Sequence, residues 1–257
     1  MLEPSALLHV AAVLAILALV AWTVSVVKHD TSIVDSFWGL YFLVGLGTYA
    51  FSVAAESPRA MLVLALATAW ALRLTLHITI RNWGEPEDRR YQAIRARNQP
   101  GYAWKSLYLV FGLQAVLAFI IGMPLFAAAG ASAPLNVIDL AGVALWVIGF
   151  AFEAIGDWQL TRFRRDPSSR GRVMDKGLWR YTRHPNYFGE AALWWGFYCF
   201  ALAAGAWWAL FAPLLMTFLL LKVSGVVLLE KDMGERRPGY RDYVARTNAF
   251  FPGVPRS

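Results

Sequence analysis

The sequence predicts an all-α integral membrane protein, a bundle of seven transmembrane helices with its N-terminus outside and its C-terminus in the cytoplasm. Its 257 residues are 58% hydrophobic and only 16% charged, whereas ordinary soluble proteins carry about 25% charged residues. Seven stretches are apolar over the roughly 20 residues that a helix needs to cross a bilayer. The Lys and Arg residues gather in alternate connections between these stretches, a distribution typical of cytoplasmic loops.

The predicted spans are separated by connections of very different length, the longest being 81–105 and 157–186. They are residues 5–27, 33–54, 60–80, 106–127, 137–156, 187–204 and 206–229. The first is expected to be a retained helix and not a cleaved leader, because only Glu3 and no basic residue precedes its apolar run.

The connections predict the orientation. Six Lys and Arg residues lie in 81–105, eight in 157–186 and six in 230–257, whereas Arg59 is the one basic residue in the connections that alternate with these. The three basic connections are therefore expected on the cytoplasmic side. Six or eight spans would break this alternation.

The composition argues against metal and nucleic-acid binding. One cysteine and four scattered histidines show no metal-ligand spacing. The formal net charge of +7 could suggest nucleic acid, but the basic clusters adjoin hydrophobic spans instead of lying among aromatic residues on a soluble surface. We expect neither a metal nor a nucleic-acid partner.

The ionisable and amide side chains inside the spans fall almost entirely in the half nearer the cytoplasm. They lie early in the outward-running spans and late in the inward-running ones: Asp35, Gln114, Asn186, Glu190, Arg73, His77, Glu153 and Lys222. Several are spaced four apart and share a helix face. Such residues are costly in a membrane and usually serve function. One polar chamber open to the cytoplasm is expected, which argues against a channel or a pump.

The connection before span 187–204 has the densest cluster of charged and polar residues. Arginines precede Pro185, a residue suited to the first turn of a helix. Free backbone amides at that helix start, together with Arg180, Arg183 and His184, predict an anion site suited to phosphate. The last segment adds Glu230, Lys231, Tyr240 and Tyr243.

The run from Gly177 to Glu190 (GLWRYTRHPNYFGE) resembles the C-terminal region of the steroid 5α-reductase superfamily. The whole chain resembles the bacterial DUF1295 branch of that superfamily, with further matches at Val34 to Gly39, Glu87 to Tyr91, Gly156 to Gln159, and Ser224-Gly225 to Glu230-Lys231. The resemblance implies an NADPH-dependent reductase that transfers a hydride to the activated C=C bond of a lipid or steroid-like substrate. It implies that 1–127 encloses the substrate and that 128–257 binds the cofactor, as one structural unit.

The resemblance and the residue pattern together give the expected site. The predicted cofactor-binding residues are Trp38, Asp157, Arg162, Arg164, Arg180, Tyr181, Arg183, His184, Asn186, Tyr187, Glu190, Glu230 and Tyr243. Steroid reductases polarise the substrate ketone with a glutamate and a tyrosine, and neither is present at the matching positions here. His77, supported by Arg73 or Asp35, is therefore the predicted catalytic group.

Two other functions remain open. The pattern Arg183-His184-Pro185-x-Tyr187-x-Gly189 also resembles isoprenylcysteine carboxyl methyltransferases, which use S-adenosylmethionine. The many arginines favour NADPH, because NADPH carries phosphates and S-adenosylmethionine carries none. A transporter is disfavoured because no internal repeat is found. We expect a monomer among membrane lipids, in a bacterial inner membrane by resemblance.

Overall fold

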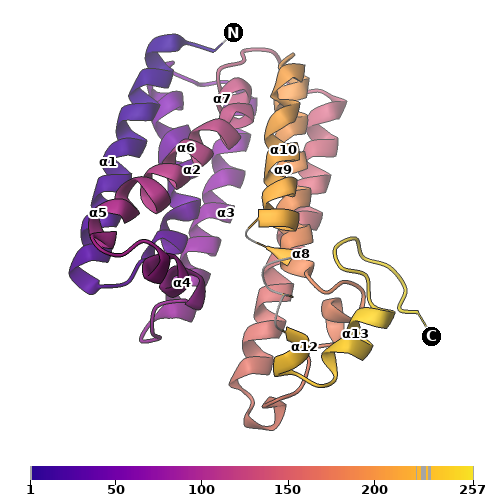
Figure 1. The fold of residues 1–257 in the computed structure, drawn as a ribbon. Helices are drawn as coiled ribbons and strands as arrows, with labels where there is room; N and C mark the ends of the chain where they lie inside the picture. The colour runs from indigo at the N-terminus through magenta and orange to yellow at the C-terminus, as the bar shows by residue number, and fades with distance from the viewer. Residues whose placement is uncertain (1, 224, 227–229, 231–232, 257) are drawn as a thin grey trace. The chain divides into compact units, whose positions relative to one another are not determined.

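The computed structural model describes residues 2–223, 225–226, 230 and 233–256, and these form helices and loops without a strand (Figure 1). The chain divides into two compact units. Unit 1 comprises Met1–Asn136 and Phe200–Ala209, and unit 2 comprises Val137–Cys199 and Leu210–Ser257. The predicted division at residue 127 stays a prediction.

Unit 1 is a bundle of long helices followed by short ones. Its elements are α1 (Pro4–Lys28), α2 (Ile33–Ser52), α3 (Pro58–Asn82), α4 (Arg89–Arg97), α5 (Tyr102–Ser106), the π-helical η1 (Leu107–Gly112), α6 (Leu113–Ile121) and α7 (Met123–Ala129). α3 starts at Pro58, where the Ser57 side chain accepts a hydrogen bond from the Ala60 amide. Both residues suit a helix N-terminus.

α2 packs between α1 and α3 in unit 1. A Cβ added at Gly39 would lie 2.8 Å from the Ala71 carbonyl oxygen, so only glycine allows this approach of α2 to α3. On another face of α2, a Cβ added at Gly45 would lie 3.5 Å from a Val10 methyl and 3.6 Å from a Leu14 methyl of α1. Small residues at such crossings are typical of helices packed in membranes.

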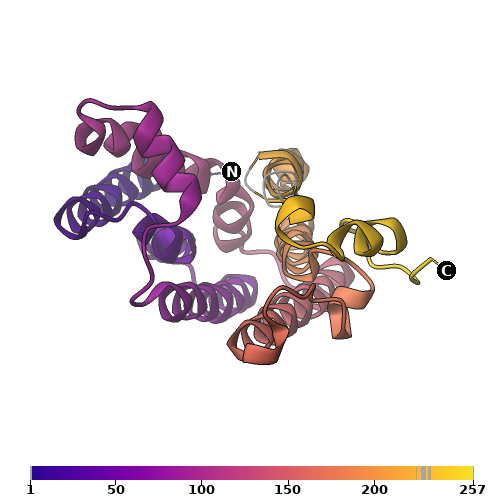
Figure 2. The ribbon, with the colours of Figure 1, turned by 60° about the horizontal axis from the view of Figure 1, so that its bottom comes forward.

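Unit 2 contains the second half of the chain's helices. Its elements are α8 (Val137–Arg165), the 3₁₀ turns η2 (Pro167–Ser169) and η3 (Gly177–Arg180), most of α9 (Pro185–Ala203), α10 (Phe211–Phe218), the π-helical η5 (Leu219–Val223), α12 (Met233–Arg236) and α13 (Tyr240–Arg246). Figure 2 shows these helices nearly end-on. The 3₁₀ turn η4 (Trp207–Leu210) precedes α10.

α8 and α9 touch along a line of glycines that we call the glycine seam: Gly142, Gly149 and Gly156 of α8, and Gly189 and Gly196 of α9. A Cβ on Gly149 would lie 2.5 Å from the Gly189 carbonyl oxygen, and one on Gly196 would lie 2.7 Å from the Gly142 carbonyl oxygen. The spacing of seven residues keeps each set on one helix face. The backbones are therefore in direct contact.

Five helices of the described chain are long and apolar enough to cross a membrane: Pro4–Lys28, Ile33–Ser52, Pro58–Asn82, Tyr102–Ile121 and Val137–Arg165. Their outward faces carry exposed Leu and Ile side chains, such as Leu8, Ile16 and Leu140. Water would penalise so much exposed apolar surface, whereas lipid does not. The chain is thus a multi-pass membrane protein.

The last two predicted spans correspond to less apolar or shorter helices. α9 covers span 187–204 but begins with polar side chains, and the apolar helix Trp207–Val223 covers much of span 206–229. Residues 224 and 227–229 of that span, and Lys231 beyond it, lie outside the described part of the chain. The count of seven spans and the orientation stay predictions.

Candidate functional site

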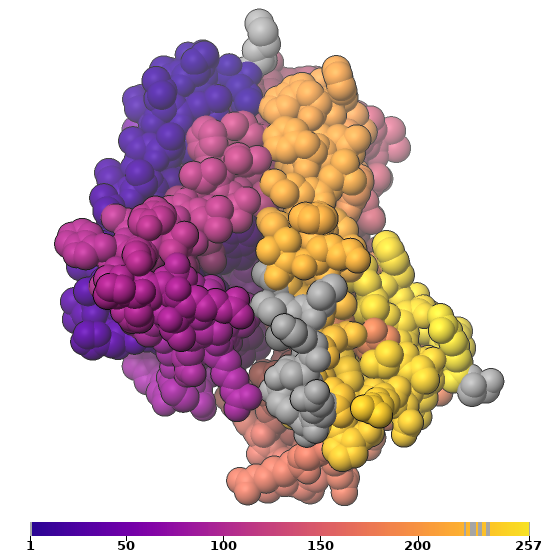
Figure 3. Space-filling model, viewed as in Figure 1, coloured from indigo at the N-terminus to yellow at the C-terminus, as the bar shows by residue number. Residues whose placement is uncertain are grey.

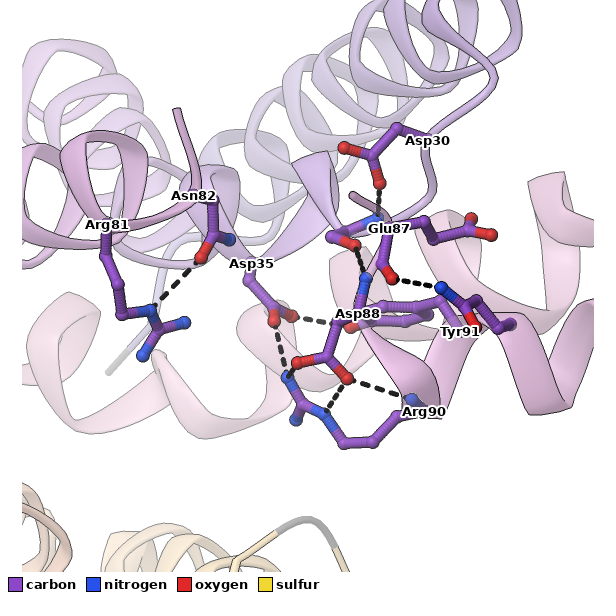
Figure 4. A network of polar contacts seen from close by, with 10 residues as sticks. Asp30, Asp35, Arg81, Asn82, Glu87, Asp88, Arg90 and Tyr91 are labelled. Atoms are coloured by element: carbon purple, nitrogen blue, oxygen red, sulfur yellow. Dashed lines mark hydrogen bonds and ion pairs between the residues drawn. The ribbon is translucent and has the colours of Figure 1, made fainter. Parts of the chain in front are cut away.

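One polar cluster lies at the start of α2, and Figure 4 shows it. We call it the loop cluster: Asp35, Glu87, Asp88, Arg90, Tyr91 and Arg95. Asp35 accepts a hydrogen bond from Arg90 Nη2 at 2.8 Å and one from the Tyr91 hydroxyl at 2.5 Å. The carboxylate that we predicted to support His77 is therefore bound by two residues of α4.

The other residues of the loop cluster connect the loop between α3 and α4 to the turn before α2. Glu87 accepts from Arg95 Nη2 at 2.7 Å and from the Thr31 amide at 2.8 Å. The Asp88 amide in turn donates to the Ser32 hydroxyl at 2.7 Å. The loop between α3 and α4 is consequently fixed to the start of α2 by both charged and backbone groups.

Glu87 and Asp88 of this loop have lowered pKa values. Burial alone would raise the pKa of Glu87, but hydrogen bonds from Arg95 and Thr31 outweigh it and bring the pKa below its usual value. Burial alone would also raise the pKa of Asp88. Hydrogen bonds from Arg90 outweigh this effect and bring the pKa below its usual value. Both groups are therefore held as carboxylates.

Acid is expected to release this loop. A carboxylate with a lowered folded pKa stabilises the fold above its unfolded pKa of about 4, and this contribution is lost as the pH falls further toward the folded value. Hydrogen exchange of the α4 amides, corrected for intrinsic exchange, should accelerate below pH 4 by up to about tenfold per pH unit for each carboxylate. In Glu87→Gln, the exchange rate of the α4 amides should depend less steeply on pH. Exchange that does not change with pH would contradict the assignment.

The other predicted residues of unit 1 lie farther along α2 and α3. Arg73 and His77 are half-buried on α3, four residues apart. Trp38 of α2 packs edge to face on Phe42, with 4.9 Å between ring centroids. Support of His77 by Arg73 or Asp35 stays a prediction.

In unit 2 the start of α9 meets α8 at a polar pair, the α8–α9 junction. Asn186 Nδ2 donates to Asp157 Oδ1 at 3.1 Å. The Asn186 side-chain oxygen is buried and has no hydrogen-bond partner among the described residues. Glu153 and Glu190 are also buried in these two helices. A buried acceptor without a donor is costly, so this atom is suited to a ligand.

A second pair of predicted residues shares one carboxylate. Glu230 accepts from Arg183 Nε at 2.8 Å and from His184 Nε2 at 2.8 Å. Burial alone would raise the pKa of Glu230, but the bonds from His184 and Arg183 lower it to about 2. The His184 ring also stacks on Tyr187. The arginine predicted for a phosphate is thus paired with an acid of this chain.

Residues 247–256, the tail segment, hold the loop before α9 in place. The Thr182 hydroxyl donates to the Phe250 carbonyl oxygen at 2.8 Å, and the Arg183 amide donates to the Asn248 carbonyl oxygen at 2.9 Å. The Gly253 amide donates to the Tyr181 carbonyl oxygen at 3.0 Å. The tail segment therefore fixes the backbone that carries Arg183.

Tyr243, predicted to contact the cofactor, lies in a network between α13 and α8. It is buried on α13, and its hydroxyl donates to the Trp179 carbonyl oxygen. The Trp179 indole in turn donates to the Gly156 carbonyl oxygen at 3.0 Å. Tyr243 thus connects α13 to α8 through Trp179.

A cleft of about 1080 Å³ lies in unit 2, between the end of α8, the 166–177 loop and α13. Figures 1 and 3 show α13 beside this loop. We call it the loop cleft, and its lining includes Trp158, Arg162, Asp166, Arg172, Lys176 and Asp242. Of the predicted cofactor residues, only Arg162 lines it.

Several residues of these sites were not predicted from the sequence. Arg90 and Tyr91 belonged to a matched motif, but only the fold brings them to Asp35. Trp158 lies four residues before the predicted Arg162 on the same helix, a spacing that could have identified it as a neighbour. Arg164, Arg180 and Tyr181, which were predicted, are exposed on unit 2.

Comparison with known proteins identifies a family but no activity. Residues 21–247 match the family model described as "Protein of unknown function (DUF1295)". The chain is 28% identical to "Uncharacterized protein C594.04c" of the fission yeast Schizosaccharomyces pombe, over 271 aligned positions that cover 92% of this chain and 77% of that protein. No solved structure matches the chain.

Proposed function

The chain belongs to the DUF1295 family, and from that premise we propose that it is a membrane-embedded reductase that uses NADPH to reduce an activated C=C bond of a lipid. The buried Asn186 side-chain oxygen carries this proposal. It needs a donor, and the carboxamide and ribose hydroxyls of a nicotinamide nucleotide are donors of the right kind.

The residues of unit 2 fit such a cofactor. Asp157 holds the Asn186 amide by its nitrogen, which leaves the oxygen to accept from a ligand. Glu230 fixes Arg183 and His184 just before the helix start, so these two residues position the loop more than they bind phosphate. When bound, NADPH supplies a hydride, and the protein supplies binding and orientation.

The residues of unit 1 are proposed to polarise the substrate. Arg73 and His77 are hydrogen-bond donors on one face of α3, and a donor aimed at a carbonyl oxygen stabilises the negative charge that develops there during reduction. Asp35 is held by Arg90 and Tyr91, and its proposed role is to keep the adjacent loop in place. An apolar, water-poor site would strengthen these interactions.

Equilibrium binding to the detergent-purified protein tests the proposal. NADPH should bind, and Asn186→Ala should weaken its binding at least about tenfold because a hydrogen bond in a buried site is lost. Asn98→Ala, the same change at a half-buried residue of unit 1 that donates to the Ile94 carbonyl oxygen at the end of α4, should leave affinity unchanged. Binding of S-adenosylmethionine without NADPH would overturn the reductase and favour the methyltransferase.

A further inference from the structure

The loop cleft is not explained by the Asn186 site, and only one residue predicted for the cofactor lines it. Resting on the proposed function, we propose that the loop cleft binds the adenosine 2′-phosphate end of NADPH, with Trp158 as the platform for the adenine and Arg172 and Lys176 as the phosphate ligands. These three residues were not among the predicted cofactor contacts.

The walls of the loop cleft are held by contacts within unit 2. The Leu178 amide donates to the Gln159 side-chain oxygen at 3.0 Å, which anchors the loop to α8. Arg246 of α13 pairs with Asp175 of the loop at 3.0 Å. The cleft is therefore shaped before a ligand arrives, and its volume of about 1080 Å³ is ample for a nucleotide.

The charges in the cleft favour a phosphate. The Asp175 charge is matched by Arg246, and Asp166 accepts from the Ser168 amide and hydroxyl at the start of η2. Arg172 and Lys176 line the cleft, where the Arg172 charge also helps to lower the pKa of Asp166, and Asp242 is the remaining acid of the lining. A phosphate monoester carries close to two negative charges and forms strong bonds with such cations.

The aromatic side chain in the cleft favours a base. Trp158 is 58% exposed although it is large and apolar. The Arg162 guanidinium lies 5.7 Å from its ring centroid, which orients the indole through a cation–π contact. Stacking of a nucleobase on such a ring is worth roughly tenfold or more in affinity.

The two parts of the proposed cofactor site adjoin on α8. Asp157 points to Asn186 at the α8–α9 junction, and Trp158, the next residue, lines the loop cleft. One helix turn thus presents the nicotinamide contact and the adenine platform. S-adenosylmethionine has an adenine but no phosphate, so it would not use Arg172 and Lys176.

Binding measurements on the purified full-length protein test this assignment, with NADPH, NADH and 2′,5′-ADP as probes in calorimetry. The double variant Arg172→Ala/Lys176→Ala should weaken NADPH and 2′,5′-ADP at least about tenfold and change NADH less than about twofold. Trp158→Ala should weaken NADPH and NADH equally. Arg170→Ala is the matched control, because Arg170 lies in the same loop, is exposed and does not line the cleft.

The outcomes separate this assignment from the proposed function. If NADPH binds but the double variant weakens NADPH and NADH by the same factor, or leaves 2′,5′-ADP binding intact, the cleft assignment is wrong and the reductase stands. If neither dinucleotide binds and S-adenosylmethionine does, the proposed function is wrong and the cleft assignment falls with it.

Discussion

Replacing Gly189 by alanine is expected to remove most of the folded protein. The new Cβ would lie 2.5 Å from the Glu153 amide nitrogen and 2.5 Å from the Gly149 carbonyl oxygen, both backbone atoms of α8. Backbone of a packed helix cannot move aside as a side-chain tip can, so we expect a cost of about 3 kcal/mol, the upper end of the usual range for overpacking. The measurement is the monodisperse fraction in size-exclusion chromatography after extraction in detergent.

Two further glycines make this a graded test. Gly47→Ala is the matched control, because a Cβ at Gly47 of α2 meets nothing within 4 Å and should leave the monodisperse fraction unchanged. Gly156→Ala should be intermediate, since its Cβ would lie 3.1 Å from Pro185 Cγ. Wild-type behaviour of Gly189→Ala would show that the helices do not approach as closely as the glycine seam requires.

Removing the shared carboxylate should have the second largest effect. In Glu230→Ala, Arg183 loses its ion pair while its side chain is only 9% exposed, and His184 loses the same partner. Loss of one partner of a fully buried pair costs about 3–5 kcal/mol. Because Glu230 is itself 20% exposed, we expect about 2 kcal/mol, or a fall of roughly 4–8 °C in the thermal midpoint.

An exposed acid provides the control for this variant. Glu85→Ala removes the same charge from an exposed position between α3 and α4 and should shift the midpoint by less than about 1 °C. Glu230→Gln should fall between the two, because it keeps an acceptor oxygen but loses the charge. An unchanged midpoint in Glu230→Ala would mean that Arg183 finds another partner.

Hydropathy predicted the bounds of the first three helices closely and those of later ones less well. The spans 5–27, 33–54 and 60–80 each end within two residues of α1, α2 and α3. α8, however, runs nine residues past the predicted span because its last turns are polar but still helical. A hydropathy window ends where lipid contact ends, whereas hydrogen bonding continues the helix.

The span 106–127 shows the opposite error. The helix there begins earlier, passes through the π-helical η1 and stops at Ile121, and α7 follows from Met123. Gly122 and Pro124 explain the break, because proline cannot donate to the preceding turn. The residue types Gly122 and Pro124 therefore indicate the helix break, whereas the hydropathy of this stretch alone does not.

The polar sites were predictable only in part. Residues four apart on one helix, such as Asn186 and Glu190, can be grouped from spacing. The partners of Arg183 and Asp35 cannot be identified from spacing. Glu230 is 47 positions from Arg183, and Arg90 is 55 positions from Asp35. Which distant segments meet depends on how the helices and loops pack, and no local pattern encodes that.

The tail segment has a consequence for the order of synthesis. The loop at 180–183 leaves the ribosome well before its partners, since Thr182 bonds to Phe250, 68 positions later. Until that stretch has been translated, the Thr182 hydroxyl and the Arg183 amide lack their carbonyl acceptors in the tail segment. The helices of unit 2 can therefore enter the membrane first, and the loop before α9 takes its final form only afterwards.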